Sequence, residues 1–176
     1  MKKSTRSVLK WVIYIVILFF LFILQTTPGF LEIMGVRPVF VLPYAVAIAM
    51  LEHERSAAAI GIVAGCLWDS ATSRLFGTSV IILMVCCVTI SLLVMYLVKS
   101  NVINNILFCL GTLVIYFLID FVFGYLIWSY SHMGLLLVRN ILPTIGYSLL
   151  FSPIFFLIMR KIRRKIYPVA EEDSSW

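Results

Sequence analysis

The stretch VFVLPYAVAIAMLEHERSAAAIGIVAGCLWD, residues 39–69, decides how the chain is arranged. It contains two short apolar runs, 39–51 and 56–68, separated by the charged sequence Glu-His-Glu-Arg at 52–55. If both runs dipped into a bilayer from outside and returned, these charges would lie deep in the hydrocarbon, at about 2.5–3.5 kcal/mol per charged residue. Two short crossing helices avoid this cost. We therefore expect both runs to cross, with residues 52–55 in the cytoplasm.

The whole chain is too apolar to cover itself with a water-facing surface. Of its 176 residues, 62% are hydrophobic and only 12% are charged, and the mean hydropathy is +1.08. This composition predicts an integral membrane protein. The formal net charge of +6 comes from basic residues gathered near the two ends of the chain. That distribution is typical of a cytoplasmic membrane surface, so no nucleic-acid partner is expected.

The expected fold is all-α, a polytopic membrane protein with about six transmembrane helices. The spans are placed at about 11–27, 38–51, 55–69, 79–98, 103–127 and 135–159. Four of them reach the length of about 20 apolar residues that a crossing needs, and the second and third are short. The Lys and Arg residues then divide as eleven inside and three outside, which predicts that both termini are cytoplasmic. Residues 1–168 are expected to form one transmembrane domain, and 169–176 a short polar tail.

Small residues mark one face of the third expected span. Gly61 and Gly65 form a G-x-x-x-G pattern, with Ala57 and Ala58 one turn earlier, so another helix can approach closely. Asp69 continues this face toward the outer end of the helix. The face either packs inside the bundle, against span one or span four, or binds a partner. Asp69 either meets interfacial water or caps nearby loop amides, or it contacts a neighbouring helix or partner.

Two further charges are expected inside the membrane. Asp120 in the fifth span and Arg139 in the sixth have similar estimated depths, so we predict that they pair. The pair is either a structural tie between adjacent spans or part of a substrate or proton site.

The sequence contains no recognisable catalytic arrangement. It has no nucleophile with a base, no paired carboxylates, no H-E-x-x-H pattern and no phosphate-cradling glycine loop. His53 and His132 are expected on opposite sides of the membrane. We therefore predict a protein that is not an enzyme and has no cofactor, metal ligands or catalytic residues.

The order of these features resembles the MreD family of rod shape-determining membrane proteins, over nearly the whole chain. In that family an Arg or Lys directly precedes a Pro. Further along the chain, a helix of small residues ends with a Gly that is followed after a few residues by an Asp. The loop after this Asp ends with Leu or Phe followed by Gly. The matching positions here are Arg37, Pro38, Gly61, Gly65, Asp69, Phe76 and Gly77. Family members often carry an acidic residue after the Arg-Pro pair, where this chain has Val39.

The resemblance implies a non-enzymatic scaffold of the bacterial cell-elongation machinery in the plasma membrane. Such a protein regulates cell shape and lateral peptidoglycan synthesis by binding MreC, and acts indirectly with MreB, RodA and its penicillin-binding transpeptidase. The implied partner-binding or structural residues are Arg37, Pro38, Gly61, Gly65, Asp69 and Gly77, to which we add Asp120 and Arg139.

The family also resembles in fold the substrate-binding subunit of energy-coupling-factor transporters. This likeness supplies the alternative function, a small-molecule, vitamin-type substrate-binding subunit of a membrane transporter. Such subunits often carry Ala-rich contact positions on the first span. The first span here, WVIYIVILFFLFIL at 11–24, contains no small residue, which argues against that mode of coupling.

Overall fold

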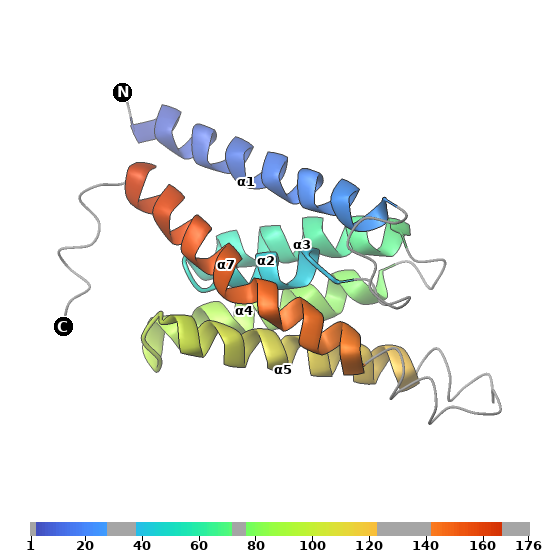
Figure 1. The fold of residues 1–176 in the computed structure, drawn as a ribbon. Helices are drawn as coiled ribbons and strands as arrows, with labels where there is room; N and C mark the ends of the chain where they lie inside the picture. Colours follow the sequence, from blue (N-terminus) through green and yellow to red (C-terminus); the bar gives the residue numbers. More distant parts are fainter. Residues whose placement is uncertain (1–2, 28–37, 72–76, 123–141, 167–176) are drawn as a thin grey trace.

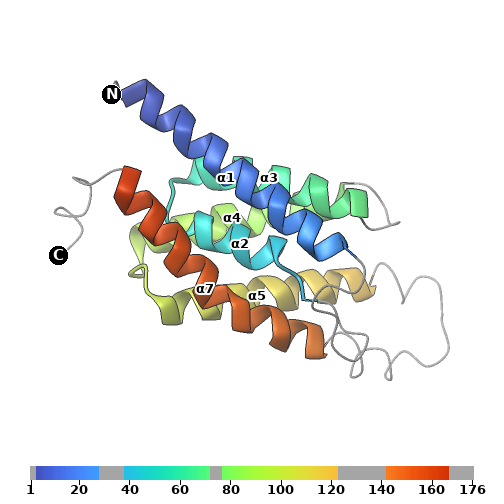
Figure 2. The same ribbon diagram turned by 45° about the horizontal axis from the view of Figure 1, so that its top comes forward.

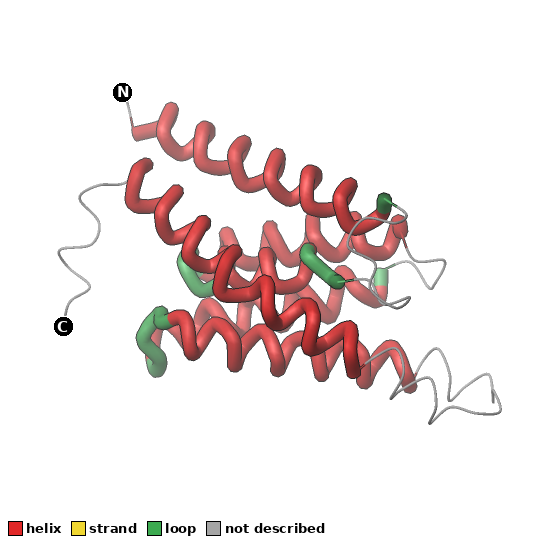
Figure 3. The backbone as a smooth tube through the Cα atoms, viewed as in Figure 1, coloured by secondary structure: helices red, strands yellow, loops and turns green. Residues whose placement is uncertain are grey.

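A computed structural model describes residues 3–27, 38–71, 77–122 and 142–166 of the chain. Within these ranges all regular structure is helical and there is no strand (Figures 1 and 3). The described helices are α1 (Lys3–Thr26), α2 (Val41–Ala49), α3 (Glu54–Ala71), α4 (Thr78–Tyr96), α5 (Val102–Phe121) and α7 (Leu142–Ile166). The predicted all-α class is confirmed.

Four of the described helices are long and apolar enough to cross a membrane. They are Val8–Thr26 in α1, Thr78–Tyr96 in α4, Val102–Asp120 in α5 and Leu142–Lys165 in α7. These correspond to the four long apolar runs of the sequence. The two short runs form α2 and α3, which do not meet this criterion. Residues 123–127 and 135–141 of the expected fifth and sixth spans lie outside the described ranges.

The short helix α2 lies at the centre of the bundle. All nine of its residues are buried, and it contacts each of the other described helices (Figures 1 and 2). Nine residues rise by only about 14 Å, roughly half the thickness of the hydrocarbon layer. Because protein surrounds α2, the non-helical residues before it can lie within the bundle without exposing backbone groups to lipid.

Four parts of the chain that are distant in sequence meet at one end of the bundle. The start of α1, the α2–α3 turn, the α4–α5 turn and the end of α7 all lie on the left in Figure 1. This end therefore collects basic residues from separate segments: Lys10, Arg55, Lys99 and the last turns of α7, with Arg163, Arg164 and Lys165. The opposite end carries the corner between α3 and α4.

Candidate functional site

The small-residue face of α3 packs directly on α4. A Cβ atom added at Gly65 would lie 2.4 Å from the Cα of Val80, and one added at Gly61 would lie 2.9 Å from the carbonyl oxygen of Leu83. Only hydrogen atoms fit in these gaps, so the two backbones approach as closely as glycine allows. Of the alternatives that the sequence left open, the structure places this face inside the bundle, against α4.

Asp69 closes the corner between α3 and α4. Its side chain is buried, with 5% of the residue exposed, and its two carboxylate oxygens accept hydrogen bonds from the N–H groups of Gly77 at 2.6 Å and Ser79 at 3.3 Å. These amides belong to the start of α4, whose first N–H groups have no partner within the helix and whose dipole favours a negative charge. The carboxylate therefore stabilises the start of α4 from the end of α3.

Gly77 stands at this corner because of its backbone conformation. It is the N-cap of α4 and has φ of +103°, in the left-handed region that side-chain-bearing residues rarely adopt. A Cβ here would meet no atom within 4 Å, so backbone strain and not crowding selects glycine. Phe76, the preceding position of the family pattern, lies outside the described residues.

A second set of polar contacts, which the sequence analysis did not anticipate, supports the same corner. The indole N–H of Trp68 donates to the hydroxyl of Tyr116, which also lies 3.2 Å from the Oγ of Ser79. The Trp68 and Tyr116 rings meet edge to face, with centroids 5.9 Å apart. These side chains join α3, α4 and α5. Trp68 directly precedes Asp69 and Ser79 follows Gly77 by two residues, but nothing in the sequence points to Tyr116.

Pro38, the first residue of the expected second span, precedes the helix α2 instead of standing in its first turn. The helix begins at Val41, and the backbone before it is held by side chains of other helices. Val39 N–H donates to the Oγ of Ser148 in α7 at 2.8 Å. Phe40 N–H and Val41 N–H both donate to Gln25 of α1, at 2.7 and 3.2 Å. These bonds satisfy backbone donors that a longer helix would have used internally, so α2 can stay short.

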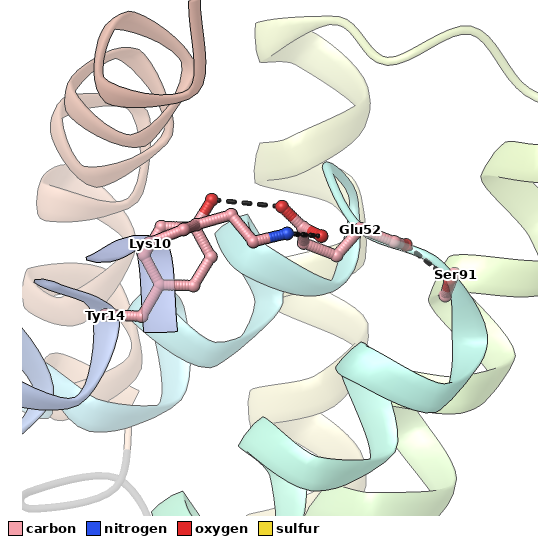
Figure 4. A network of polar contacts seen from close by, with 4 residues as sticks. All are labelled: Lys10, Tyr14, Glu52 and Ser91. Carbon is pink, nitrogen blue, oxygen red and sulfur yellow. Dashed lines mark hydrogen bonds and ion pairs between the residues drawn. The ribbon is translucent and has the colours of Figure 1, made fainter. Parts of the chain in front are cut away.

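A buried ion pair ties α1 to the α2–α3 turn (Figure 4). Lys10 Nζ lies 2.7 Å from Oε2 of Glu52, and the two side chains are only 10% and 7% exposed. The hydroxyl of Tyr14 donates to Oε1 of Glu52 at 3.1 Å, and Ser91 of α4 donates to the Glu52 carbonyl at 2.7 Å. Lys10, Tyr14, Glu52 and Ser91 form what we call the Glu52 network. Because each acceptor has a nearby donor, the buried carboxylate is compensated.

The sequence contained only a weak signal for the Glu52 network. Lys10 and Tyr14 are four residues apart and so share one face of α1. Lys10 belongs to the basic cluster near the N-terminus and Glu52 to the charged sequence 52–55, and nothing local links the two. Among the described residues no three His, Cys, Asp or Glu side chains gather as metal ligands would. The network has the chemistry of a structural tie, since it joins α1 and α4 to the α2–α3 turn.

The remaining predicted residues are only partly placed. Asp120 is half-buried near the end of α5. Arg139 and Arg37 lie outside the described residues, so the Asp120–Arg139 pair stays a prediction.

A polar contact that the sequence analysis missed also joins α5 to α7: Nδ2 of buried Asn105 donates to Oγ of Ser152 at 2.7 Å.

A comparison with family models gives a match over nearly the whole chain. The model of the rod shape-determining protein MreD matches residues 5–166, from the first turn of α1 to the end of α7. Comparisons with curated proteins and with solved structures gave no match.

Proposed function

Because the chain belongs to the family of the rod shape-determining protein MreD, we propose that it is a non-enzymatic scaffold of the bacterial cell-elongation machinery that acts by binding MreC. The observation that carries this proposal is the extent of the family match, which takes in all the described helices and not one motif. Through MreC the scaffold would couple MreB filaments to RodA and its penicillin-binding transpeptidase. It would thereby regulate cell shape and lateral peptidoglycan synthesis.

The proposed placement is multi-pass in the plasma membrane, with both termini in the cytoplasm. The gathering of basic residues at one end of the bundle supports it, because cytoplasmic loops carry an excess of Lys and Arg. His53 is exposed at that end. A cysteine at position 53 should react with a membrane-impermeant reagent only after the cytoplasmic side is opened, and one at 132 should react in intact cells. External labelling at position 53 would overturn this orientation.

The surface that binds MreC should lie on the outside of the bundle. The small-residue face of α3 is occupied by α4, and α2 is enclosed on all sides. Among the four candidate spans α1 is the least covered: 22% of its window is buried, against 39% for α4 and 28% each for α5 and α7. We therefore assign the MreC contact to the open side of α1.

The exposed side chains of α1 have a spacing that suits a helical partner. Those that form the α1 stripe are Val8, Val12, Val16, Phe19 and Ile23, each 47–60% exposed. Successive members are four, four, three and four residues apart, close to the spacing of three or four residues seen where one helix packs along another. Lipid tails are as apolar as these side chains, so such contact depends on fit and not on water exclusion. A single-pass helix such as that of MreC presents the shape required.

Site-specific photocrosslinking tests the proposal. Benzoylphenylalanine at Val16 or Phe19 should give a crosslink to co-expressed MreC, whereas the same group at Leu107 of α5, which is 62% exposed, should not. Val16→Trp should reduce MreC recovery at unchanged protein level, and Leu107→Trp should leave it unchanged. Crosslinks from α5 alone would move the contact away from α1. Failure of the wild-type protein to co-purify with MreC would overturn the function itself.

The alternative, a vitamin-type substrate-binding subunit, gains no specific support from the described residues. The expected likeness to energy-coupling-factor subunits also stays a prediction. A vitamin retained through purification of the wild-type protein would favour that function over the scaffold.

A further inference from the structure

The basic end of the bundle contains a cavity of about 670 Å³. It lies between the α2–α3 turn, the α4–α5 turn and the last turns of α7. Four cationic side chains line it: Lys99, Arg160, Arg163 and Arg164. They come from two segments more than 60 residues apart in the sequence, so it is the fold that brings them to one space.

The negative charge in the cavity wall is already compensated. Glu52, the only acidic side chain among the described residues of the lining, is paired with Lys10 at 2.7 Å and also accepts a hydrogen bond from Tyr14. The described part of the lining therefore carries more cationic than anionic side chains. Cations that share a concave space of low dielectric raise the local concentration of anions.

Two polar residues of the α4–α5 turn, Ser100 and Asn101, also line the cavity. The Oγ of Ser100 is buried and has no hydrogen-bond partner within the described part of the chain. Asn101, which follows it, is the N-cap of α5 but makes no side-chain capping bond. The first N–H groups of α5 follow directly after these two residues, and the Asn101 side chain accepts a hydrogen bond from none of them. A helix N-terminus with a hydroxyl and guanidinium groups beside it is an arrangement that binds phosphate.

We propose that this cavity binds a phosphate group, with Arg160, Arg163 and Lys99 as the charged contacts and Ser100 and the α5 N-terminus as the neutral donors. The phosphate belongs either to an anionic phospholipid headgroup or to a free phosphate compound. Two exposed apolar residues of the lining, Met95 and Leu97, favour the lipid, because they would lie beside its acyl chains. The proposal does not depend on MreC binding.

Native mass spectrometry of the full-length protein tests this. The protein is reconstituted in nanodiscs of phosphatidylcholine with or without phosphatidylglycerol. It is then released from the nanodiscs in the mass spectrometer, and the lipid that stays bound to it is identified by mass. The variant Lys99→Gln/Arg163→Gln removes two cavity charges. The matched control, Lys161→Gln/Lys165→Gln, removes two exposed charges of α7 that do not line the cavity. Loss of two direct charge-assisted contacts to the phosphate should lower phosphatidylglycerol retention about tenfold or more in the cavity variant.

The control variant should retain phosphatidylglycerol within about twofold of wild type, since its charges act only from the surface. Ser100→Ala, which keeps every charge, should also lower retention and guards against misfolding of the double variant. Equal losses in the cavity and control variants, or equal retention of phosphatidylcholine, would overturn the proposal.

A second arm separates the sources of the phosphate. Inorganic phosphate is titrated into wild-type protein and the cavity variant in detergent by calorimetry. Binding that the variant loses, without selective phosphatidylglycerol retention, would assign the cavity to a free phosphate compound. Binding of a polyglutamate peptide that the cavity variant loses, with no binding of phosphatidylglycerol or inorganic phosphate, would overturn the proposal in favour of an acidic protein segment.

Discussion

The close approach of α3 and α4 predicts that one added methyl group at Gly65 destabilises the protein. In Gly65→Ala the new Cβ would lie 2.4 Å from the Cα and 2.8 Å from the N of Val80. Carbon atoms in contact prefer a separation of about 3.5–4.0 Å, so α3 and α4 would have to move apart by about 1 Å. Both clashing atoms belong to the backbone, so no change of rotamer relieves the contact.

The expected size of the effect follows from two opposing contributions. Overpacking of a tight interface costs about 1–3 kcal/mol. Replacing Gly by Ala within a helix recovers about 0.5–1 kcal/mol of backbone entropy. From the middle of the two ranges the net destabilisation should be about 1 kcal/mol. For a chain of this size each kcal/mol lowers Tm by about 2–4 °C, so we expect a decrease of about 2–4 °C.

The assay is the loss of the monodisperse peak of detergent-solubilised protein after heating, followed by fluorescence-detected size exclusion. Gly111→Ala in α5 is the matched control, because a Cβ there meets no atom within 4 Å. It gains the same helix propensity without a clash, so its Tm should be unchanged or slightly raised. Gly61→Ala, with its nearest contact at 2.9 Å, should fall between the two.

Equal Tm values for Gly65→Ala and Gly111→Ala would refute the packing argument. The larger change Gly65→Leu distinguishes an internal face from a partner face. On an internal face it should lower the level of the protein itself, and MreC recovery only in proportion. A normal level with MreC recovery abolished would show instead that this face binds the partner.

Three further predictions concern charged residues. Asp69→Ala removes the acceptor at the start of α4 and should lower the free energy of unfolding by the ~0.5–2 kcal/mol of a lost helix cap, with a smaller loss for Asp69→Asn. An unchanged Tm in the same melting assay would contradict the capping role. Lys10→Ala and Glu52→Ala each leave a buried charge without its partner, so the double-mutant cycle should give a coupling of about 0.5–3 kcal/mol, and zero coupling would refute the ion pair. For the predicted pair of Asp120 and Arg139, each change to Ala should reduce membrane-extracted protein more than the double change does, and additive losses would exclude the pair.

Membrane location, helical class and family could all be predicted from the sequence. The free energy of transferring a segment into lipid is the sum of contributions from its own side chains. A helix in lipid forms all its backbone hydrogen bonds within the segment. Both properties are local, so the four long apolar runs predicted the four candidate spans. The family pattern likewise pointed to Asp69 and Gly77, which meet at one corner.

Contacts between distant segments could not be predicted in the same way. Lys10 and Glu52 are 42 residues apart, and each was accounted for by its own local surroundings. The side chains of Gln25 and Ser148 hold the backbone before α2. Both residues occur in apolar runs, where nothing in the sequence distinguishes them from other isolated polar residues. Only the folded chain shows which donor meets which acceptor.

The tertiary structure alone decided which helix faces pack together. In water, the apolar side of a helix marks its buried face, but the side chains of α4 are apolar on nearly every side. Lipid and protein interior are equally apolar, so periodicity cannot separate a face that contacts lipid from one that contacts α3. The use of Gly61 and Gly65 against α4, and the enclosure of α2 by all its neighbours, depend on shape and close backbone approach, which exist only once the helices are assembled.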